Sequence, residues 1–199
     1  MKILIGIVAS ERNNFSWFFI QSLLQLKAHM GSSAIVTCVH SGTIPDGRNA
    51  VLDIAKQHNC DYALMIDSDM TFPADGIDKL LVSMNKMDAK IGCGIYFGTY
   101  PPYKSTPMAY DEKDGVQVVL DDWSKTRYIT SCGMGFTMID KSLFDIRFEF
   151  RPMLGEDHLF CKEARARGNK IILEPSIKCG HMRTVIIEEE FVKRNSGVL

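Results

Sequence analysis

Short apolar runs alternate with segments of helical spacing along the first half of the chain. Three runs rich in aliphatic and β-branched residues predict strands over 3–8, 34–39 and 62–66. Between them, apolar residues at helical spacing predict a helix over 15–30 that ends at Gly31, and a second helix is predicted over about 45–58. This β-α-β-α-β order predicts a parallel sheet built by right-handed crossovers.

The second half of the chain continues with further strands and helices and one hairpin. The hairpin is predicted over 108–121 around Asp114-Gly115, a dipeptide typical of two-residue turns. The other expected elements are, in order, a helix from Pro73 to about Met87, a strand over 90–97, a pair of strands over 127–131 and 136–139, a helix over 156–167 and a strand over 170–173. We therefore expect one α/β domain over 1–199, with a mostly parallel central sheet, flanking helices, a small antiparallel hairpin region and a C-terminal tail from about residue 185.

Two carboxylates one residue apart, Asp67 and Asp69, follow the strand over 62–66. Ligands gather at the carboxyl ends of parallel strands, so this pair marks a candidate site. In extended backbone both would face the same way, with Ser68 opposite. Carboxylates so close repel each other, and a hard divalent cation would hold both ionised. The alternative is a solvated loop with a helix cap, because Asp-Ser-Asp ahead of Pro73 also suits a helix N-terminus.

Other polar residues stand in apolar surroundings further along the chain. Glu156 and Asp157 open a predicted helix, either as capping carboxylates or with a general base at the rim of a pocket. His181 could add an imidazole to a Mn²⁺ site, although a single histidine is more often a packing or surface residue. Arg48 could bind an anion beside a helix N-terminus or be an exposed first-turn residue. Arg183 could neutralise a phosphate or be solvated.

Charge and cysteine content change the range of functions to consider. The formal net charge of −1 provides no overall basic field, so we expect neither nucleic acid nor an anionic membrane as a partner. The apolar N-terminal run stops at Glu11 and Arg12, too early for a membrane span or a signal peptide. Six cysteines without a Cys-x-x-Cys pair predict reduced, buried packing residues. We expect a soluble, cytoplasmic protein.

Taken together, the motifs resemble those of the GT-A glycosyltransferases, particularly the family-two-like enzymes and their short viral and bacterial relatives. The resemblance runs from Ile3 to about Arg183. It rests on five segments in the family's order: Pro45-Asp46-Gly47-Arg48-Asn49, Ile66-Asp67-Ser68-Asp69-Met70, Gly133-Met134-Gly135-Phe136, Gly155-Glu156-Asp157 and His181. It implies the Rossmann-like GT-A fold of nucleotide-diphospho-sugar transferases.

The resemblance also implies a role for each matching residue. Asp69 matches the metal-binding carboxylate of the family's Asp-x-Asp motif, Asp67 its ribose or metal partner, and His181 the histidine that completes the metal shell. Asp157, preceded by Glu156, matches the base of inverting members. The segment from Ala9 to Arg12 corresponds to the part that meets the nucleotide base and ribose, and Gly133 to Gly135 would line the sugar and acceptor side. The donor-binding residues expected on this basis are Ala9, Ser10, Glu11, Arg12, Arg48, Asp67, Ser68, Asp69, Gly133, Gly135 and Arg183.

The activity implied is transfer of a hexose from a nucleotide-diphosphate sugar to a hydroxyl of a glycan or glycoprotein acceptor. Mn²⁺ or Mg²⁺ would be required, with a UDP-sugar preferred over a GDP-sugar, and a base at Asp157 favours inversion. One alternative is a nucleotidyltransferase that makes sugar nucleotides, but 10–14 lacks the glycine-rich, basic signature of those enzymes. Another is a non-catalytic nucleotide-sugar-binding scaffold, against which the complete set Asp67, Asp69, Asp157 and His181 argues. Oligomeric state is not predicted.

Overall fold

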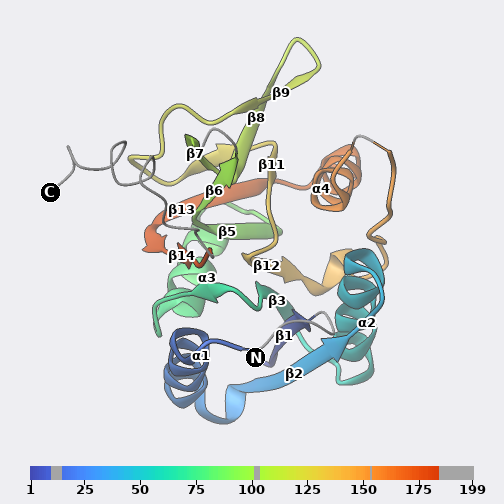
Figure 1. Ribbon diagram of the computed structural model, residues 1–199. Coiled ribbons are helices and arrows are strands. Elements are labelled where there is room, and N and C mark those ends of the chain that lie inside the picture. Colours follow the sequence, from blue (N-terminus) through green and yellow to red (C-terminus); the bar gives the residue numbers. More distant parts are fainter. Residues whose placement is uncertain (10–14, 101–103, 153, 184–199) are drawn as a thin grey trace, which may run out of the picture.

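A seven-stranded mixed sheet forms the centre of the computed structural model (Figure 1). The structure describes residues 1–9, 15–100, 104–152 and 154–183, so the expected contacts of Ser10, Glu11 and Arg12 and the expected tail lie outside the described residues. The strand order is β2-β1-β3-β12-β5-β13-β10. The bounds are β1 (Ile3–Ala9), β2 (Ala34–His40), β3 (Tyr62–Asp67), β5 (Ile91–Ile95), β10 (Arg127–Ile129), β12 (Phe136–Asp140) and β13 (Ile171–Lys178).

Three of the six neighbouring strand pairs of this sheet are parallel, and three are antiparallel. β1 pairs in parallel with both β2 and β3, and β5 pairs in parallel with β13. β12 lies antiparallel between β3 and β5, and β10 adds an antiparallel edge to β13. The prediction of an α/β sheet flanked by helices is therefore confirmed, but the sheet is mixed, with β12 reversed at its centre and β10 reversed at its edge.

Helices cover both faces of the sheet (Figure 1). α1 (Trp17–Met30) and α3 (Gly76–Lys86) pack on one face, and α2 (Ile44–Gln57) and α4 (Glu156–Ala166) pack on the other. Short 3₁₀ turns occupy Gly31–Ser33 and Lys141–Leu143. Alternate side chains of β1 enter the two cores: Ile3 and Ile5 face α1 and α3, while Leu4 faces α2. Burial on both faces explains why the strands read as continuous apolar runs.

Helix starts follow local capping chemistry. Ser16 accepts a hydrogen bond from the Phe19 N–H at 3.1 Å and begins α1, and Thr43 accepts one from the Asp46 N–H at 3.2 Å and begins α2. The expected start of the next helix at Pro73 is wrong, because α3 begins only at Gly76 after the N-cap Asp75. Asp67 and Asp69 therefore do not cap a helix.

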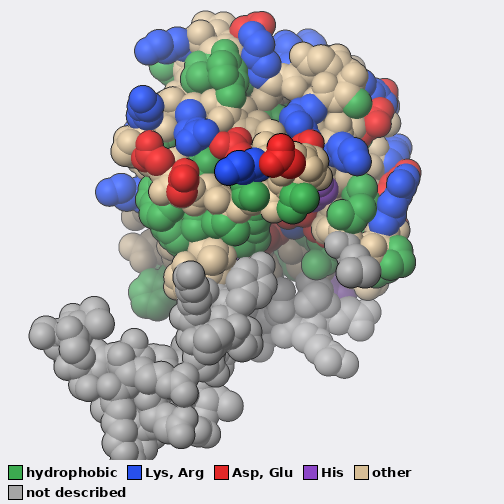
Figure 2. Space-filling view, turned by 90° about the horizontal axis from the view of Figure 1, so that it is seen from above, with side chains coloured by type: hydrophobic (Ala, Val, Ile, Leu, Met, Phe, Trp, Pro, Cys, Tyr) green, Lys and Arg blue, Asp and Glu red, His purple; other side chains and the backbone are tan. Residues whose placement is uncertain are grey.

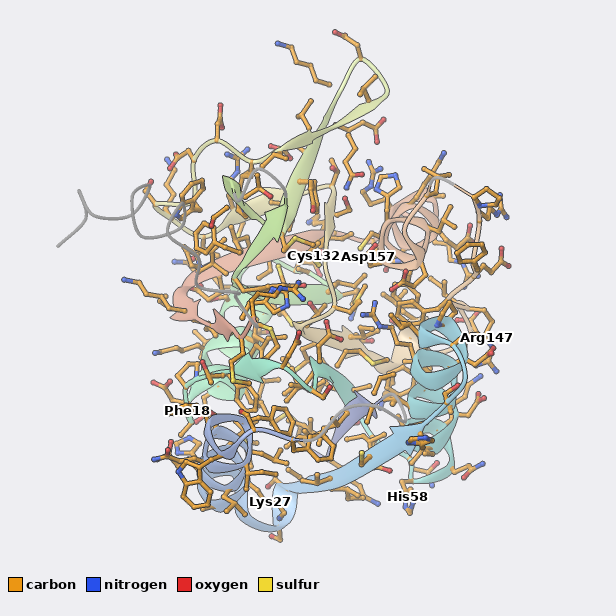
Figure 3. All side chains as sticks on the ribbon, viewed as in Figure 1. Phe18, Lys27, His58, Cys132, Arg147 and Asp157 are labelled. Carbon is orange, nitrogen blue, oxygen red and sulfur yellow. The ribbon has the colours of Figure 1, made fainter. Side chains whose placement is uncertain are left out.

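One side of α1 exposes apolar residues. Phe19 and Leu26 are buried against the sheet, as their spacing predicts, but Trp17, Phe18 and Leu24 are exposed. Phe18 projects away from the sheet in Figure 3. None of the helices in the described ranges is both long and apolar enough to cross a membrane.

Small antiparallel pairs extend from the main sheet. The predicted hairpin is confirmed as β8 (Ala109–Lys113) and β9 (Val116–Val119), joined by Asp114 and Gly115 at φ 53° and 76°. Positive φ at both central residues is what this turn requires. β11 (Ser131–Cys132) adds to β8, β6 (Phe97–Tyr100) pairs with β7 (Lys104–Pro107), and β4 (Met70–Thr71) pairs with β14 (Gly180–His181).

Several element predictions need correction. The segments over 127–131 and 136–139 do not pair with each other: β10 joins β13, β11 joins β8, and β12 enters the main sheet. A fully buried apolar run such as Phe136–Ile139 gains more from a central position than from a local hairpin. The strand expected over 90–97 is divided at Tyr96 into β5 and β6, and the last strand continues to Lys178. Cys38 is exposed, whereas the other five cysteines are buried as predicted.

The face seen in Figure 2 carries charges of both signs. Lys and Arg side chains lie among Asp and Glu side chains on this face. Elsewhere in the described ranges, surface charges also pair with opposite charges: Arg165 lies 2.7 Å from Glu112, and Arg127 lies 2.7 Å from Asp111. Opposite charges interspersed in this way do not build a strong field of one sign.

Candidate active site

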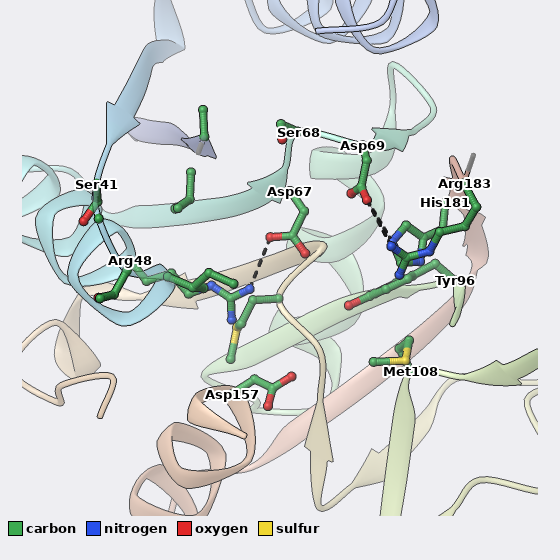
Figure 4. Close-up of a pocket in the computed structure, with 16 residues that line it drawn as sticks. Ser41, Arg48, Asp67, Ser68, Asp69, Tyr96, Met108, Asp157, His181 and Arg183 are labelled. Carbon is green, nitrogen blue, oxygen red and sulfur yellow. Dashed lines mark hydrogen bonds and ion pairs between the residues drawn. The ribbon is translucent and has the colours of Figure 1, made fainter. Parts of the chain in front are cut away.

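A pocket of about 360 Å³ lies at the carboxyl ends of β1, β2, β3 and β5 (Figure 4). This is the edge where ligands bind in open α/β sheets. Besides those strand ends, the start of α4 and the segment after β13 contribute side chains. The lining residues are Val8, Ala9, Ser41, Gly42, Thr43, Ile44, Arg48, Asp67, Ser68, Asp69, Tyr96, Met108, Met134, Asp157, His181 and Arg183.

Asp69 and His181 meet on one side of this pocket. His181 Nε2 lies 3.2 Å from Asp69 Oδ2, although 112 residues separate them in the sequence. The two-residue β4–β14 pair places His181 opposite Met70, and the Met182 N–H donates to the Asp69 carbonyl at 2.8 Å. Backbone hydrogen bonds therefore fix the two side chains relative to each other.

The ring orientation of His181 determines which nitrogen faces the pocket. Its Nδ1 lies 3.0 Å from the Phe97 carbonyl oxygen, and a carbonyl can only accept, so Nδ1 carries a hydrogen. In the neutral imidazole the lone pair is then on Nε2, beside Asp69. The hydrogen bond with Asp69 raises the pKa of His181, so a cation would compete with a proton for this nitrogen.

This carboxylate and imidazole form a donor set that suits Mn²⁺. Arg183 Nη1 lies 3.6 Å from Asp69 Oδ2, which adds a positive charge beside the pair. Burial alone would raise the pKa of Asp69, but the hydrogen bond and charge of His181 and the charge of Arg183 outweigh it and lower the pKa. Within the described ranges, no group of three or more His, Cys, Asp or Glu side chains is clustered as a metal site. The pair thus fits a cation whose remaining ligands come from a bound molecule or water.

Asp67 is held away from that pair by Arg48. Arg48 Nη2 donates to Asp67 Oδ1 at 3.2 Å, and its Nη1 lies 2.8 Å from Glu156 Oε1. The Arg48 side chain is only 5% exposed, so the alternative of an exposed first-turn residue is wrong. Burial alone would lower the pKa of Arg48, but the charges of Asp67, Glu156 and Asp157 outweigh it and raise the pKa. Arg48 therefore links the end of β3 to the start of α4.

The neighbouring Asn49 strengthens the same link. Its side chain exchanges two hydrogen bonds of 2.9 Å with the backbone of Phe148. The Phe148 ring stacks on Phe160 of α4 at 4.2 Å, and the Arg48 guanidinium lies 5.7 Å from the centre of the same ring. The Arg48-Asn49 pair singled out in the sequence thus fixes how α4 approaches the pocket.

Asp157 faces the pocket from the first turn of α4 (Figure 4). The N-cap Gly155 makes no side-chain capping bond, whereas Asp157 Oδ1 accepts a hydrogen bond from the His158 N–H at 2.7 Å within the first turn. A Cβ at Gly155 would come within 2.5 Å of Asp157 Oδ1, so glycine leaves room for that carboxylate. Burial raises the pKa of Asp157, and Glu156 and Asp67 add to the rise while Arg48 opposes it. Glu156 itself is directed to Arg48 rather than to the pocket.

Gly133 and Gly135 take a different place from the one expected. Neither lines the pocket, whereas Met134 between them does. A Cβ at Gly133 would collide with the Tyr96 hydroxyl oxygen, and a Cβ at Gly135 would lie 2.8 Å from Tyr96 Cζ. The two glycines therefore make space for the Tyr96 side chain, which sequence reasoning missed.

Two groups of pocket residues could have been found from the predicted strands and the residues at their ends. Ser41 to Ile44 follow β2, and Tyr96 lies near the end of the strand predicted over 90–97 and follows β5, so both stand close to carboxyl ends of strands. Met108 carries no comparable signal, because it reaches the pocket through a backbone bond from its N–H to the Tyr96 carbonyl.

Removing the Arg48 guanidinium should destabilise the fold. In Arg48→Met, Asp67 and Glu156 lose their buried cation, and breaking such a pair costs about 3–5 kcal/mol. The two carboxylates are 34% and 20% exposed and can regain water, so we expect the lower end, about 3 kcal/mol, in urea unfolding. Arg147→Met is the matched control, because Arg147 pairs with Asp53 at the surface and should cost about 0–1 kcal/mol. Equal losses in the two variants would contradict the role given to Arg48.

Comparisons with known proteins bear on the fold. No protein-family model matches the sequence, and no curated protein matches it. Solved structures do match. A197 from STIV superposes with a TM-score of 0.63 at 17% identity, covering 92% of this chain and 87% of A197. GalNAc-T7, in a crystal structure with UDP, GalNAc and Mn²⁺, gives 0.63 at 11% identity, covering 92% of this chain and 43% of that one.

A third match is S. aureus TarS 1-349 in complex with UDP-GlcNAc, with a TM-score of 0.57 at 14% identity. It covers 97% of this chain and 64% of the TarS chain, so this protein spans less than two thirds of both TarS and GalNAc-T7. Identities this low show the fold alone. The chain has the mixed α/β fold of GT-A proteins, a fold shared with nucleotide-sugar glycosyltransferases.

Proposed function

We propose that this protein is a metal-dependent glycosyltransferase that moves a hexose from a nucleotide-diphosphate sugar to a hydroxyl of a glycan or protein. The observation that carries the proposal is the Asp69–His181 pair, which shares one pocket with the carboxylate of Asp157. A cation-binding pair and a separate base are the two elements that such a transfer needs. UDP is the preferred nucleotide, since UDP or a UDP-sugar is present in the matching structures of GalNAc-T7 and TarS.

We assign different residues of the pocket to different parts of the donor molecule. Asp69 and His181 would hold Mn²⁺ or Mg²⁺, which when bound offsets the charge that develops on the diphosphate leaving group. Arg183 adds a second positive charge beside Asp69. Asp67, with Oδ1 occupied by Arg48, is assigned to the ribose rather than to the cation. Ala9 and Ser68 also line the pocket and are assigned to the nucleotide site.

Asp157 would accept the proton of the attacking hydroxyl. An ordinary carboxylate with a pKa near 4 is a weak base toward an alcohol, so the proton moves late, as the oxygen bonds to the anomeric carbon and becomes acidic. Burial makes Asp157 a stronger base than an exposed aspartate. Glu156 holds Arg48 and stays outside the proton transfer. A base acting on the acceptor directly favours inversion at the anomeric carbon.

Calorimetric titration with UDP and with GDP tests the donor site. Each nucleotide is added to the purified protein with Mn²⁺ and again with EDTA. We expect one nucleotide, UDP, to bind with Mn²⁺ and not with EDTA. Binding that ignores EDTA would remove the metal from the proposal, and binding of neither nucleotide would overturn the donor class.

The pH dependence of the reaction should report Asp157. The base must be ionised, and its pKa is raised, so at saturating donor and Mn²⁺ the rate should rise with pH through an apparent pKa above the ordinary carboxylate value of about 4. Below that pKa the rate should fall about tenfold per pH unit. Release of UDP from the sugar nucleotide is the measurement. A rate independent of pH across the acidic range would contradict the assignment.

A further inference from the structure

Tyr96 is the least exposed polar residue at the centre of the pocket. It follows β5, its side chain is almost fully buried at 3% exposure, and its ring meets His181 edge-on with ring centres 5.6 Å apart. Figure 4 shows its hydroxyl end directed into the space between Asp67 and Asp157. The phenol thus reaches from the cation-binding pair toward the base.

Gly133 and Gly135 fix the position of the Tyr96 hydroxyl. The Gly135 N–H donates to the Tyr96 oxygen at 3.1 Å, and the space occupied by the phenol exists because 133 and 135 carry no Cβ. A phenol is protonated at neutral pH and has one hydrogen to donate. Because the Gly135 N–H already points at one lone pair of the Tyr96 oxygen, the hydroxyl hydrogen of Tyr96 must point in another direction.

The Tyr96 O–H has no acceptor within the described parts of the chain. A buried donor left without a partner is destabilising, so proteins rarely keep one without use. Because Tyr96 lines the pocket, the open direction for the hydrogen is the pocket itself. The missing acceptor is therefore expected to be an oxygen atom of the bound molecule.

We propose that the Tyr96 hydroxyl donates a hydrogen bond to a hydroxyl of the sugar being transferred, and so distinguishes the sugar nucleotide from the free nucleotide. This inference rests on the function proposed above. The anomeric carbon joins the sugar to the diphosphate beside Asp69 and is attacked beside Asp157, so the sugar occupies the space between them. Tyr96 is a neutral donor that faces this space, whereas the positive charge of Arg183 lies beside Asp69.

The test compares UDP with UDP-sugars in Tyr96→Phe. Calorimetry with Mn²⁺ is first run on the wild type with UDP, UDP-glucose, UDP-galactose, UDP-GlcNAc and UDP-GalNAc, and the tightest UDP-sugar is kept. We expect Tyr96→Phe to bind UDP with unchanged affinity and the UDP-sugar about tenfold more weakly, the effect of one lost hydrogen bond. Tyr128→Phe is the matched control, because Tyr128 donates to the Met87 carbonyl outside the pocket.

The outcomes separate this inference from the proposed function. If Tyr96→Phe binds UDP and the UDP-sugar more weakly by the same factor, Tyr96 has a structural role through Gly135 and the inference is overturned. If the affinity for neither ligand falls, the inference is also overturned. In both cases nucleotide binding by the wild type still stands. Wild-type protein that binds UDP but no UDP-sugar would remove the sugar subsite. Wild-type protein that binds no nucleotide would overturn the proposed function itself, and this inference with it.

Discussion

Asp69→Asn should abolish Mn²⁺-dependent binding of UDP. The substitution keeps the size of the side chain but removes the charge that a divalent cation requires, and it leaves His181 as a single neutral ligand. We expect the affinity for UDP in the presence of Mn²⁺ to fall at least 100-fold, to the level that the wild type shows with EDTA. The fold should persist, because Asp69 is 40% exposed and its backbone carbonyl keeps its bond from Met182.

Asp78→Asn is the matched control for Asp69→Asn. Asp78 forms the same kind of pair with His29, at 2.7 Å, but between α1 and α3 and outside the pocket. Its loss should leave nucleotide binding unchanged. Unchanged Mn²⁺-dependent binding in Asp69→Asn would show that the cation is held elsewhere.

Asp157→Asn should retain donor binding and lose transfer. Asparagine cannot accept the proton, and a positioned general base contributes about 10²–10⁴-fold to the rate. The assay is release of UDP from the UDP-sugar, with water or a glycan as acceptor, and donor affinity is measured separately by calorimetry. Glu163→Gln, an exposed acid on the same helix that pairs with Arg167, should change neither quantity.

The stability of Asp157→Asn adds an independent readout. Because the folded-state pKa of Asp157 is raised, the folded protein holds this proton more tightly than the unfolded chain, and that stabilisation is lost as pH rises through the raised pKa. At neutral pH the ionised carboxylate therefore lowers stability, so the asparagine variant should melt at the wild-type temperature or above. A normal transfer rate would contradict the base assignment, and a lower melting temperature would contradict the expected effect on stability.

The regular part of the fold could be predicted from sequence because its signals are local. Continuous apolar runs such as Ile3 to Val8 and the helical spacing of Phe19 and Leu26 follow from burial on both faces of a sheet. The insertion of β12 between β3 and β5 had no such signal. It depends on which distant strands Phe136–Asp140 meets, and that choice is made by long-range packing rather than by periodicity.

Some residues of the candidate site could likewise be predicted from sequence, and others could not. Asp67 and Asp69 could be found because polar residues at the end of an apolar strand are visible in the sequence, and Asp157 because it opens a helix. The contact of His181 with Asp69 depends on a strand pair of two residues, too short to predict. The residue types suggested His181 as a possible further ligand, and the resemblance to GT-A glycosyltransferases assigned it to the metal shell. Tyr96 was interpreted as part of the apolar strand over 90–97, and the sequence does not indicate that its hydroxyl lies against Gly133 and Gly135.

The most direct test of a donor site at this edge of the sheet is a crystal structure of the protein with UDP and Mn²⁺. Anomalous scattering locates the manganese independently of the protein atoms. We expect one manganese coordinated by the Asp69 carboxylate and His181 Nε2, with the diphosphate of UDP as a further ligand and Asp157 free of the metal. Manganese bound elsewhere, or UDP bound outside the pocket, would contradict a donor site at this edge of the sheet.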